Sequence, residues 1–442
     1  MHRAFLCGAI LICVCRAADT RLVDAVRDRD LSAVQSLIAE HADVNEARPD
    51  GSTALAWAAW LNEQQIFEAL LKAGAKIETS DDYGETPLTL ACANGNAAMI
   101  RDLLDAGANA GAMRRDGATA LMIAARSGSV DATRMLLEKG AAVDAPEARG
   151  QTALMWAAAE GHAEVAALLL ARGANPNSAS RAGFTPLIFA ARKGEMKTVL
   201  ELIRGHAEVN QTVLSGQSAL EIALLDGKTE IAGLLLDHGA GVNAADKEGI
   251  TPLHAAAQAG DVLLVKRLLT SGANVNARTA AIPQPTGKTA SLFLRLSVGE
   301  LTPLHIAARA NRVDVMRALM AAGADPRLKA QDGATLLISA AASGHVEAVR
   351  YAYTLDQGVN SANQNGTTAA HAAISAFHTA SEDDIVDVLR FLADHGANLD
   401  AKDIRGRTPM KIAGAIPLED VTAALSKMAG ESRHATVNRA GP

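Results

Sequence analysis

Residues 150–177 read GQTALMWAAAEGHAEVAALLLARGANPN, and this stretch is one copy of a unit that recurs through most of the chain. The copies align on the Thr two residues after the first Gly, and the first seven aligned residues lie 33 apart. They are Thr53, Thr86, Thr119, Thr152, Thr185, Ser218 and Thr251, and after an interruption Thr302, Thr335, Thr368 and Thr408. A fixed period of this length predicts a solenoid of stacked units.

Each part of the unit favours one local structure. The Thr is a good N-cap, and in several copies Pro follows at the first helical position, where its missing N–H costs nothing. The Ala pair that follows, such as Ala157-Ala158, keeps this first helix thin, so that a second helix can pack closely. A Gly such as Gly161 then permits a left-handed turn before the second helix, which ends at another Gly. The unit is therefore a helix pair joined to the next by an extended finger.

The period and its motifs resemble the ankyrin repeat. The most specific matches are TPLHAAA at residues 251–257 and TPLHIAA at residues 302–308. The resemblance implies an all-α, ankyrin-repeat solenoid of helix-turn-helix units with extended finger loops, covering residues 19–430. One such unit cannot bury its own apolar face, whereas stacked neighbours share a continuous core.

Departures from the repeat support the same geometry. Asn62 and Asn311 replace Gly in the turn between the helices, and His206 and Asp356 stand where the helix-ending Gly is expected. Asn, Asp and His are the residues other than Gly that best tolerate left-handed backbone. We expect all four to adopt it.

The domain organisation follows from the register, with about twelve units including the caps. We expect a signal peptide at 1–18, an N-terminal capping repeat at 19–48, repeats at 49–276, an inserted finger loop at 277–300, a second block of repeats with a C-terminal cap at 301–430, and a disordered tail at 431–442.

Residues 1–18 have the layout of a secretory signal peptide: a positive start, an apolar stretch and small residues at Ala17 and Ala18 for cleavage. The alternative is an apolar N-terminal cap helix. Three of the four cysteines lie in this segment, so cleavage leaves only Cys92, which takes a small position of its repeat and is expected to be buried. Export to the periplasm or beyond the cell is the expected localisation, in a chain whose Ala- and Arg-rich composition is typical of bacteria.

The insertion at 277–300 contains Gly287-Lys288-Thr289, but a phosphate-binding loop needs Gly at position 282, where this chain has Ile282. The insertion is either a passive extended finger or a loop that contacts a partner. We expect it to displace the usual contact with the next unit. Glu300, which replaces a finger Gly, is expected to weaken this joint further.

No catalytic or metal-binding pattern stands out. His254, His305 and His371 hold the TPLH position, where the resemblance implies inter-repeat hydrogen bonds, and no His or Cys has the spacing of a metal site. The sequence predicts a protein that is not an enzyme and has no cofactor and no metal.

The resemblance places partner binding on the finger tips and the concave face of the first helices, just before the Thr and seven or eight residues after it. By this register the candidates are Trp60, Leu61, Tyr83, Glu85, Asp116, Arg126, Arg149, Glu160, Phe184, Arg192, Lys193, Glu248, Gln258 and Arg309. The alternative is a solvated face with Trp60 folded onto the N-terminal cap. Trp57 and Trp156, four residues after the Thr, are expected in the core.

The function that these features favour is a non-enzymatic, exported scaffold that binds a protein partner. The alternative is an exported effector or protective factor that modulates a host or envelope enzyme. The formal net charge of −7 disfavours nucleic acid as a partner. We expect no membrane span and a monomer.

Overall fold

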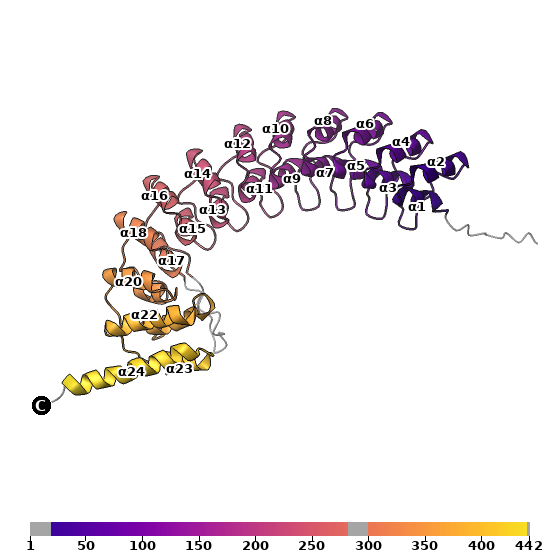
Figure 1. Ribbon diagram of the computed structural model, residues 1–442. Helices are drawn as coiled ribbons and strands as arrows, with labels where there is room; N and C mark the ends of the chain where they lie inside the picture. Colours follow the sequence, from indigo (N-terminus) through magenta and orange to yellow (C-terminus); the bar gives the residue numbers. More distant parts are fainter. Residues whose placement is uncertain (1–18, 282–298, 440–442) are drawn as a thin grey trace, which may run out of the picture. The chain divides into compact units, whose positions relative to one another are not determined.

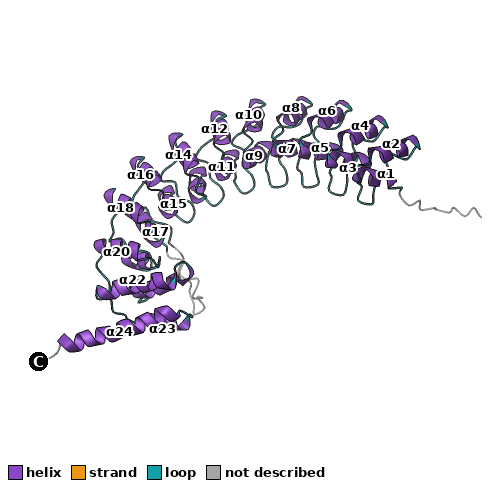
Figure 2. Cartoon of the chain, in the orientation of Figure 1, coloured by secondary structure: helices purple, strands orange, loops and turns teal. Residues whose placement is uncertain are grey.

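The computed structural model describes residues 19–281 and 299–439, and this part of the chain is helical throughout, with no β-strand (Figure 1, Figure 2). The predicted all-α solenoid of helix pairs is confirmed. The chain divides into two compact units. Unit 1 extends to Lys193 and includes Lys197–Ala207, and unit 2 comprises Gly194–Met196 and the residues from Glu208 onward. The expected signal peptide at 1–18 lies outside the described residues.

Unit 1 contains the first helices α1, α3, α5, α7, α9 and α11, each followed by its second helix. The bounds are α1 Arg21–Arg27, α2 Leu31–Ala39, α3 Ala54–Leu61, α4 Gln64–Lys72, α5 Pro87–Asn94, α6 Ala97–Asp105, α7 Ala120–Ser127, α8 Val130–Glu138, α9 Ala153–Glu160, α10 Ala163–Ala171, α11 Pro186–Lys193 and α12 Met196–Arg204. The first helices form one row and the second helices another, and the fingers project from the row of first helices (Figure 1).

Unit 2 continues the same alternation. Its bounds are α13 Ala219–Leu225, α14 Thr229–Asp237, α15 Pro252–Ala259, α16 Val262–Thr270, α17 Pro303–Arg309, α18 Val313–Ala321, α19 Leu336–Ala341, α20 Val346–Leu355, α21 Ala369–Ile374, the 3-10 helix η2 Ser375–His378, α22 Glu382–Asp394, α23 Pro409–Ala415 and α24 Glu419–Arg439. The 3-10 helix accounts for the longer turn in the unit of α21.

Caps and left-handed turns set the limits of these helices, as predicted. The Oγ1 atom of Thr53 accepts a hydrogen bond from the amide of Ala56 at the start of α3. Asn62 and Asn311 have φ values of 62° and 53°, and His206 has 65°, so three of the four predicted substitutions adopt left-handed backbone. Asp356 is an error of the prediction: its φ is −140°, and α20 ends in an extended residue whose carboxylate accepts from the amide of Gly358 at 3.0 Å.

The core lies between the helices of neighbouring units. In unit 1, α3 packs on α5, α5 on α7, α7 on α9, and α9 on α11. Small residues such as Ala58 and Ala59 allow this close approach and are fully buried, while Phe67 fills the space between α4 and the first helices. Cys92 takes an Ala position and is also buried. Burial raises the pKa of its thiol, which indicates a packing role.

Successive fingers are joined by backbone hydrogen bonds. The amide of Asp82 donates to the carbonyl of Asp50 at 2.8 Å, and the amide of Arg115 donates to the carbonyl of Tyr83 at 3.0 Å. Asn side chains at the base of several fingers add a second connection, as where Asn243 Oδ1 accepts from the amide of Asn274 at 2.8 Å. Within each compact unit, such bonds therefore join consecutive fingers.

The insertion at 277–300 keeps these connections at both of its ends. The amide of Ala280 donates to the carbonyl of Glu248 on the preceding finger, and the amide of Gln331 on the next finger donates to Gly299 at 3.0 Å. The amide of Thr279 donates to the carbonyl of Leu301 at 3.0 Å and closes the neck of the loop. The expected loss of contact with the next unit is therefore wrong, because Gly299 keeps the backbone hydrogen bond to the next finger.

Glu300 adopts the left-handed backbone of the Gly that it replaces, with φ 56°. Two further expectations differ from the structure. The boundary between the two compact units falls near Ala207. The repeats on either side of the insertion therefore belong to the same compact unit, unit 2. At the C-terminus α24 continues to Arg439, through most of the segment 431–442 that was expected to be disordered. No Pro or Gly interrupts the sequence between Gly430 and Arg439, so the helix has no local reason to end earlier.

Candidate functional site

The exposed side of the first helices, here called the inner face, has a simple register. The seventh residue after the capping Thr lies over the fourth residue after the Thr of the next unit. Arg27 places its guanidinium carbon 5.0 Å from the ring centre of Trp57, and Arg126 lies at the same distance from Trp156. The face therefore already uses guanidinium-on-indole contacts.

Trp57 and Trp156 are half-buried on this face, so their expected place in the core is wrong. Both indoles keep a polar contact at the finger base. Trp57 Nε1 donates to Ser52 Oγ at 2.9 Å, and Trp156 Nε1 donates to Gln151 Oε1 at 3.0 Å. An amphipathic ring with a hydrogen-bonded edge suits a partly wet surface.

Most of the candidate partner-binding residues lie at the surface and apart from one another. Those exposed are Trp60, Tyr83, Asp116, Arg126, Arg149, Glu160, Arg192, Lys193, Glu248 and Gln258, and those half-buried are Leu61, Glu85, Phe184 and Arg309. Four of them are engaged in ion pairs: Glu85 and Asp116 with Arg114 at 3.2 and 3.5 Å, and Glu160 with Lys193 at 3.6 Å. Phe184 contacts Phe189, with ring centres 5.2 Å apart. Their register alone does not define a site.

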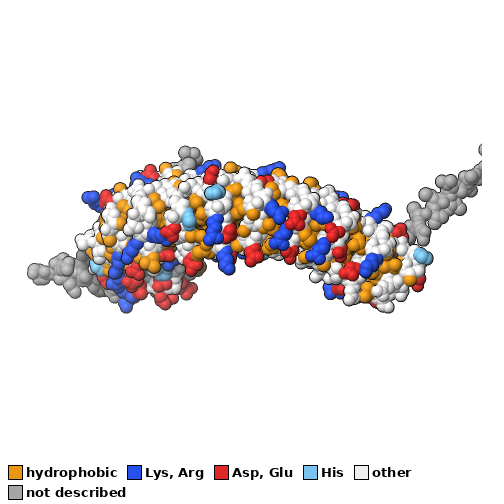
Figure 3. All heavy atoms as spheres, turned by 90° about the horizontal axis from the view of Figure 1, so that it is seen from above, with side chains coloured by type: hydrophobic (Ala, Val, Ile, Leu, Met, Phe, Trp, Pro, Cys, Tyr) orange, Lys and Arg blue, Asp and Glu red, His pale blue; other side chains and the backbone are white. Residues whose placement is uncertain are grey.

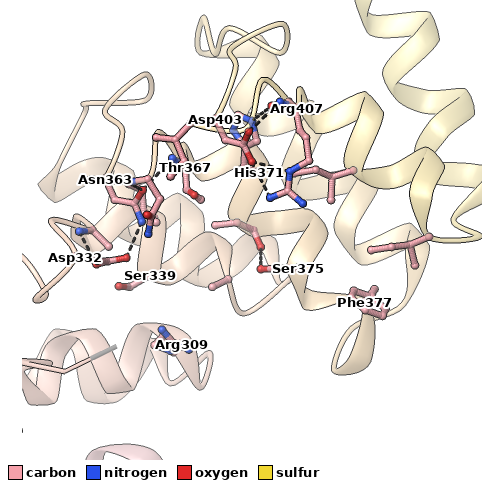
Figure 4. A pocket seen from close by; sticks show the side chains of 18 of the residues that line it. Arg309, Asp332, Ser339, Asn363, Thr367, His371, Ser375, Phe377, Asp403 and Arg407 are labelled. Carbon is pink, nitrogen blue, oxygen red and sulfur yellow. Dashed lines mark hydrogen bonds and ion pairs between the residues drawn. The ribbon is translucent and has the colours of Figure 1, made fainter. Parts of the chain in front are cut away.

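Two hollows gather some of these residues. Trp60 and Glu85 share a pocket in unit 1 with Trp57. Arg309 lines a separate hollow in unit 2, here called the C-terminal hollow, whose volume is about 160 Å³ (Figure 4). Its lining consists of Arg309, Asp332, Ala334, Ile338, Ser339, Ala342, Asn363, Asn365, Thr367, His371, Ala372, Ser375, Phe377, His378, Asp403, Ile404, Arg407, Ile412 and Ile416.

Small side chains create the C-terminal hollow. At the fourth and seventh positions the other units carry at least one longer side chain, whereas the units of α19 and α21 carry only small ones, Ser339 with Ala342 and Ala372 with Ser375. Longer side chains of the flanking units, Arg309 on one side and Ile412 on the other, form the end walls. Register alone does not indicate this site, because its signal in the sequence is the run of small residues at that register.

Polar side chains are fixed along the finger side of the hollow (Figure 4). Asn363 Nδ2 donates to Asp332 Oδ2 at 2.6 Å, and Arg407 pairs with Asp403 at 2.7 Å. Burial alone would raise the pKa of Asp403, but hydrogen bonds from Arg407 hold it below its usual value. Burial lowers the pKa of Arg309, and the nearby carboxylate of Asp332 opposes this shift. Asp403 is thus held as a hydrogen-bonded carboxylate.

Of the TPLH histidines, His254 and His371 make the inter-repeat hydrogen bonds that the resemblance implies, whereas His305 Nε2 has no hydrogen-bond partner among the described residues. His371 Nδ1 lies 2.9 Å from Thr368 Oγ1, and its Nε2 lies 3.1 Å from the carbonyl oxygen of Arg407 in the next unit. Burial lowers the pKa of His371, which keeps the imidazole neutral in this setting. A ring held on both nitrogens is a poor general base for a molecule in the hollow.

The C-terminal hollow is suited to binding a side chain rather than to catalysing a reaction. The side toward the helices is apolar, through Ile338, Phe377, Ile412 and Ile416, and the exposed Ile404 stands at the finger tip. Ligand pockets for drug-sized molecules have volumes of about 300–1,000 Å³, so this hollow suits a single side chain. Within residues 19–281 and 299–439, no group of three His, Cys, Asp or Glu residues could hold a metal ion.

The face that carries the second helices has a more open hollow in unit 2, lined by residues of α14 and α16 such as Gly233, Leu264 and Arg267. Figure 3 shows acidic and basic side chains interspersed along it, with hydrophobic side chains scattered between them. No helix in the described part of the chain is long and apolar enough to cross a membrane.

A family model described as ankyrin repeats, three copies, matches residues 22–114, 98–180, 187–279 and 304–403, which together make up most of the chain.

Two curated relatives, both from Latrodectus tredecimguttatus, match parts of the chain. Alpha-latroinsectotoxin-Lt1a is 35% identical over 121 residues, which is 27% of this chain and 8% of that protein. Alpha-latrocrustotoxin-Lt1a is 29% identical over 129 residues, which is 29% of this chain and 8% of that protein. The similarity therefore concerns a small segment of each of these relatives.

Proposed function

Because the chain belongs to the ankyrin-repeat family, whose repeats support protein–protein interaction, we propose that it is a non-enzymatic scaffold that holds one protein partner on its inner face. The observation that carries this proposal is the C-terminal hollow. It combines an apolar wall, fixed polar groups on its finger side and the volume of a single side chain.

The hollow favours a partner segment in extended conformation. Such a segment crosses the first helices and places one apolar side chain between Ile338 and Ile412. Its backbone then lies beside the polar groups of the fingers, where Asn365 and Thr367 offer hydrogen-bonding groups. Interfaces commonly derive most of their affinity from a few such anchors in well-packed pockets.

Export remains part of the proposal and rests on the sequence of residues 1–18. An exported scaffold works in the periplasm or outside the cell, as a monomer with a single thiol. The second candidate, an effector or protective factor that modulates a host or envelope enzyme, uses the same binding face. N-terminal sequencing of the protein from its host tests export: a start near Ala18 or Asp19 supports it, and a start at Met1 contradicts it.

Site-specific photocrosslinking in the native host tests the binding face. A benzophenone amino acid replaces Ser375, at the floor of the hollow, or Leu225, which has the same register in α13 and lies outside the hollow. We expect position 375 to give one discrete crosslinked protein and to attach to an apolar residue in it. Equal, diffuse crosslinking from positions 375 and 225 would show that the hollow is not the binding face.

A filling variant provides the second arm of this experiment. Ser375→Trp places at this register the residue that unit 1 carries at Trp60, so the repeat can accommodate it. The matched control is Leu225→Trp. Loss of the partner with Ser375→Trp alone supports the hollow, provided that both variants keep the thermal transition of the parent protein.

A further inference from the structure

The pocket in unit 1 that contains Trp60, here called the tryptophan pocket, differs in chemistry from the C-terminal hollow. Its volume is about 260 Å³, and its lining includes Trp57, Trp60, Asp50, Asp81 and Glu85. The two indoles meet edge to face, with ring centres 5.2 Å apart. The pocket therefore combines two aromatic rings with three carboxylates, and no Lys or Arg lines it.

Trp60 is the open member of the aromatic pair. Its side chain is 55% exposed, although Trp is among the residues that proteins usually cover. Arg27 lies over Trp57, but within the described residues no guanidinium lies over Trp60. Trp60 occupies the seventh position of its unit, where Arg27, Arg126, Arg192 and Arg309 stand in others. At this position the inner face therefore has the exposed indole of Trp60 but no guanidinium packed over it.

The carboxylates of the pocket are fixed by hydrogen bonds, and the charge of Arg48 acts on Asp50. Asp50 accepts from the amide and hydroxyl of Ser52 at 2.9 and 2.6 Å, and these bonds hold the pKa of Asp50 below its usual value. Asp81 accepts from the amides of Tyr83 and Glu85 at 2.8 and 2.9 Å. Glu85 pairs with Arg114, but among the described residues no cation pairs with Asp50 or Asp81. Two fixed carboxylates that make no ion pair among the described residues therefore line the same pocket as an exposed indole.

We propose that the tryptophan pocket binds an arginine side chain on a basic segment of the protein partner. The guanidinium stacks on Trp60, as Arg27 does on Trp57 and Arg126 on Trp156 in this same chain, and its N–H groups reach Asp50 and Asp81. Cation–π contacts and charge-assisted hydrogen bonds reinforce each other in such an arrangement. This inference rests on the proposed function and specifies the charge of the partner.

The probe for this site is hexa-arginine amide, and hexa-citrulline amide is its neutral counterpart of the same shape. The chain has three Trp residues, so the variant Trp156→Phe leaves only Trp57 and Trp60 as fluorophores. We expect a saturable change in their fluorescence with hexa-arginine and none with hexa-citrulline at the same concentration. Equal responses to the two peptides would overturn the proposal.

Matched pairs of variants separate the pocket from general charge attraction. In the Trp156→Phe background, Asp50→Asn with Asp81→Asn is compared with Asp116→Asn and Glu147→Gln. Asp116 and Glu147 have the same registers in later fingers and make similar turn hydrogen bonds, to the amides of Ala118 and Gln151. Both pairs remove two negative charges from unit 1 and keep the turn acceptors.

We expect the pocket pair to weaken hexa-arginine binding by roughly tenfold, the scale of one charge-assisted contact, and the control pair by less than about twofold. Equal weakening by both pairs would show that only net charge attracts the peptide and would overturn the proposal. Because the pocket and the C-terminal hollow lie in different units, a failed titration leaves the crosslinking result at position 375 intact, and the two failures are distinguishable.

Discussion

The Nε2 atom of His254 lies 3.0 Å from the carbonyl oxygen of Leu301, 47 residues further along the chain. The other ring nitrogen, Nδ1, lies 2.8 Å from Thr251 Oγ1 at the start of α15. One imidazole thus caps its own helix and holds the next unit across the insertion. This bond is one reason why the repeats on both sides of residues 277–300 form one compact unit.

Acid should weaken the protein through this imidazole. Burial lowers the pKa of His254 to about 4, from an ordinary value of 6.5. The neutral ring therefore stabilises the folded state above pH 6.5, and this contribution is lost as the pH falls toward 4. When the pH falls from 7.5 to 5, we expect the parent protein to lose about 2 kcal/mol more unfolding free energy than the His254→Gln variant.

Urea denaturation at the two pH values measures this effect. His238→Gln is the control, since His238 is exposed in the preceding unit. Equal acid sensitivity of the parent protein and His254→Gln would contradict the assignment.

Base should weaken the protein through Glu221, which takes the TPLH position in the unit of α13. Its side chain is 1% exposed, and its Oε1 has no hydrogen-bond partner among the described residues. Burial, with the nearby carboxylate of Asp246, raises the pKa of Glu221 to about 8. A raised pKa stabilises the folded state fully below the ordinary value of 4.5, and this stability is lost as the pH rises toward 8.

We therefore expect Glu221→Gln to increase the free energy of unfolding at pH 8.5 by roughly 1–3 kcal/mol and to change it little at pH 5. Denaturant titrations at both pH values provide the measurement. Glu230→Gln, at an exposed acid on α14, should show no such dependence. A uniform effect of Glu221→Gln at both pH values would rule out titration as its cause.

Relief of backbone strain at the insertion should stabilise unit 2. Glu300 holds a left-handed conformation, with φ 56°, and its carboxylate pairs with Arg278 at 3.2 Å on the surface. Glu300→Gly removes the strain, and Glu300→Ala removes only the ion pair. We expect the Gly variant to exceed the Ala variant by about 1 kcal/mol in unfolding free energy, measured by urea denaturation. Identical stabilities would indicate that Glu300 carries no strain.

Substitution of the inner face of unit 1 should leave the fold nearly intact. Trp60, Arg126 and Arg192 are exposed, although Trp60 and Arg126 each contact an indole. We expect the triple Ala variant to lose about 1–2 kcal/mol, against about 3–5 kcal/mol for Phe67→Ala in the core. Thermal unfolding of the two variants provides the comparison. A loss as large as that of Phe67→Ala would place the three side chains in the packed interior.

The sequence predicts the fold well because each backbone requirement is met by a residue type. Asn62, Asn311 and His206 adopt the left-handed turns that their identities allow, and the Thr residues cap the first helices. Asp356 shows the limit of this reasoning. The same residue type leaves α20 in an extended conformation, because its side chain caps the amide of Gly358 instead.

The candidate site was harder to predict because it depends on side-chain size across several units. The repeat register correctly selected Arg309, which lies at the edge of the C-terminal hollow. It could not show that Ser339 and Ser375 leave space beside Arg309. The period also does not show that the ring of Trp57, at the fourth position of its unit, remains partly exposed beside Arg27. The repeat register predicts which positions lie on the inner face, but the hollow that their side chains form depends on how neighbouring units pack.

The hydrogen-bonded neck of the insertion makes finger length an adjustable property of this molecule. Thr279 and Leu301 are joined whatever number of residues lies between them, and the neighbouring fingers bind Ala280 and Gly299. A flexible replacement of twice the length would cost only about 0.6 kcal/mol more to close, so we expect an exchange of the residues between Ala280 and Gly299 to be tolerated. An epitope, a tag or a recognition sequence could be grafted between these two anchors while the helices on either side keep their register.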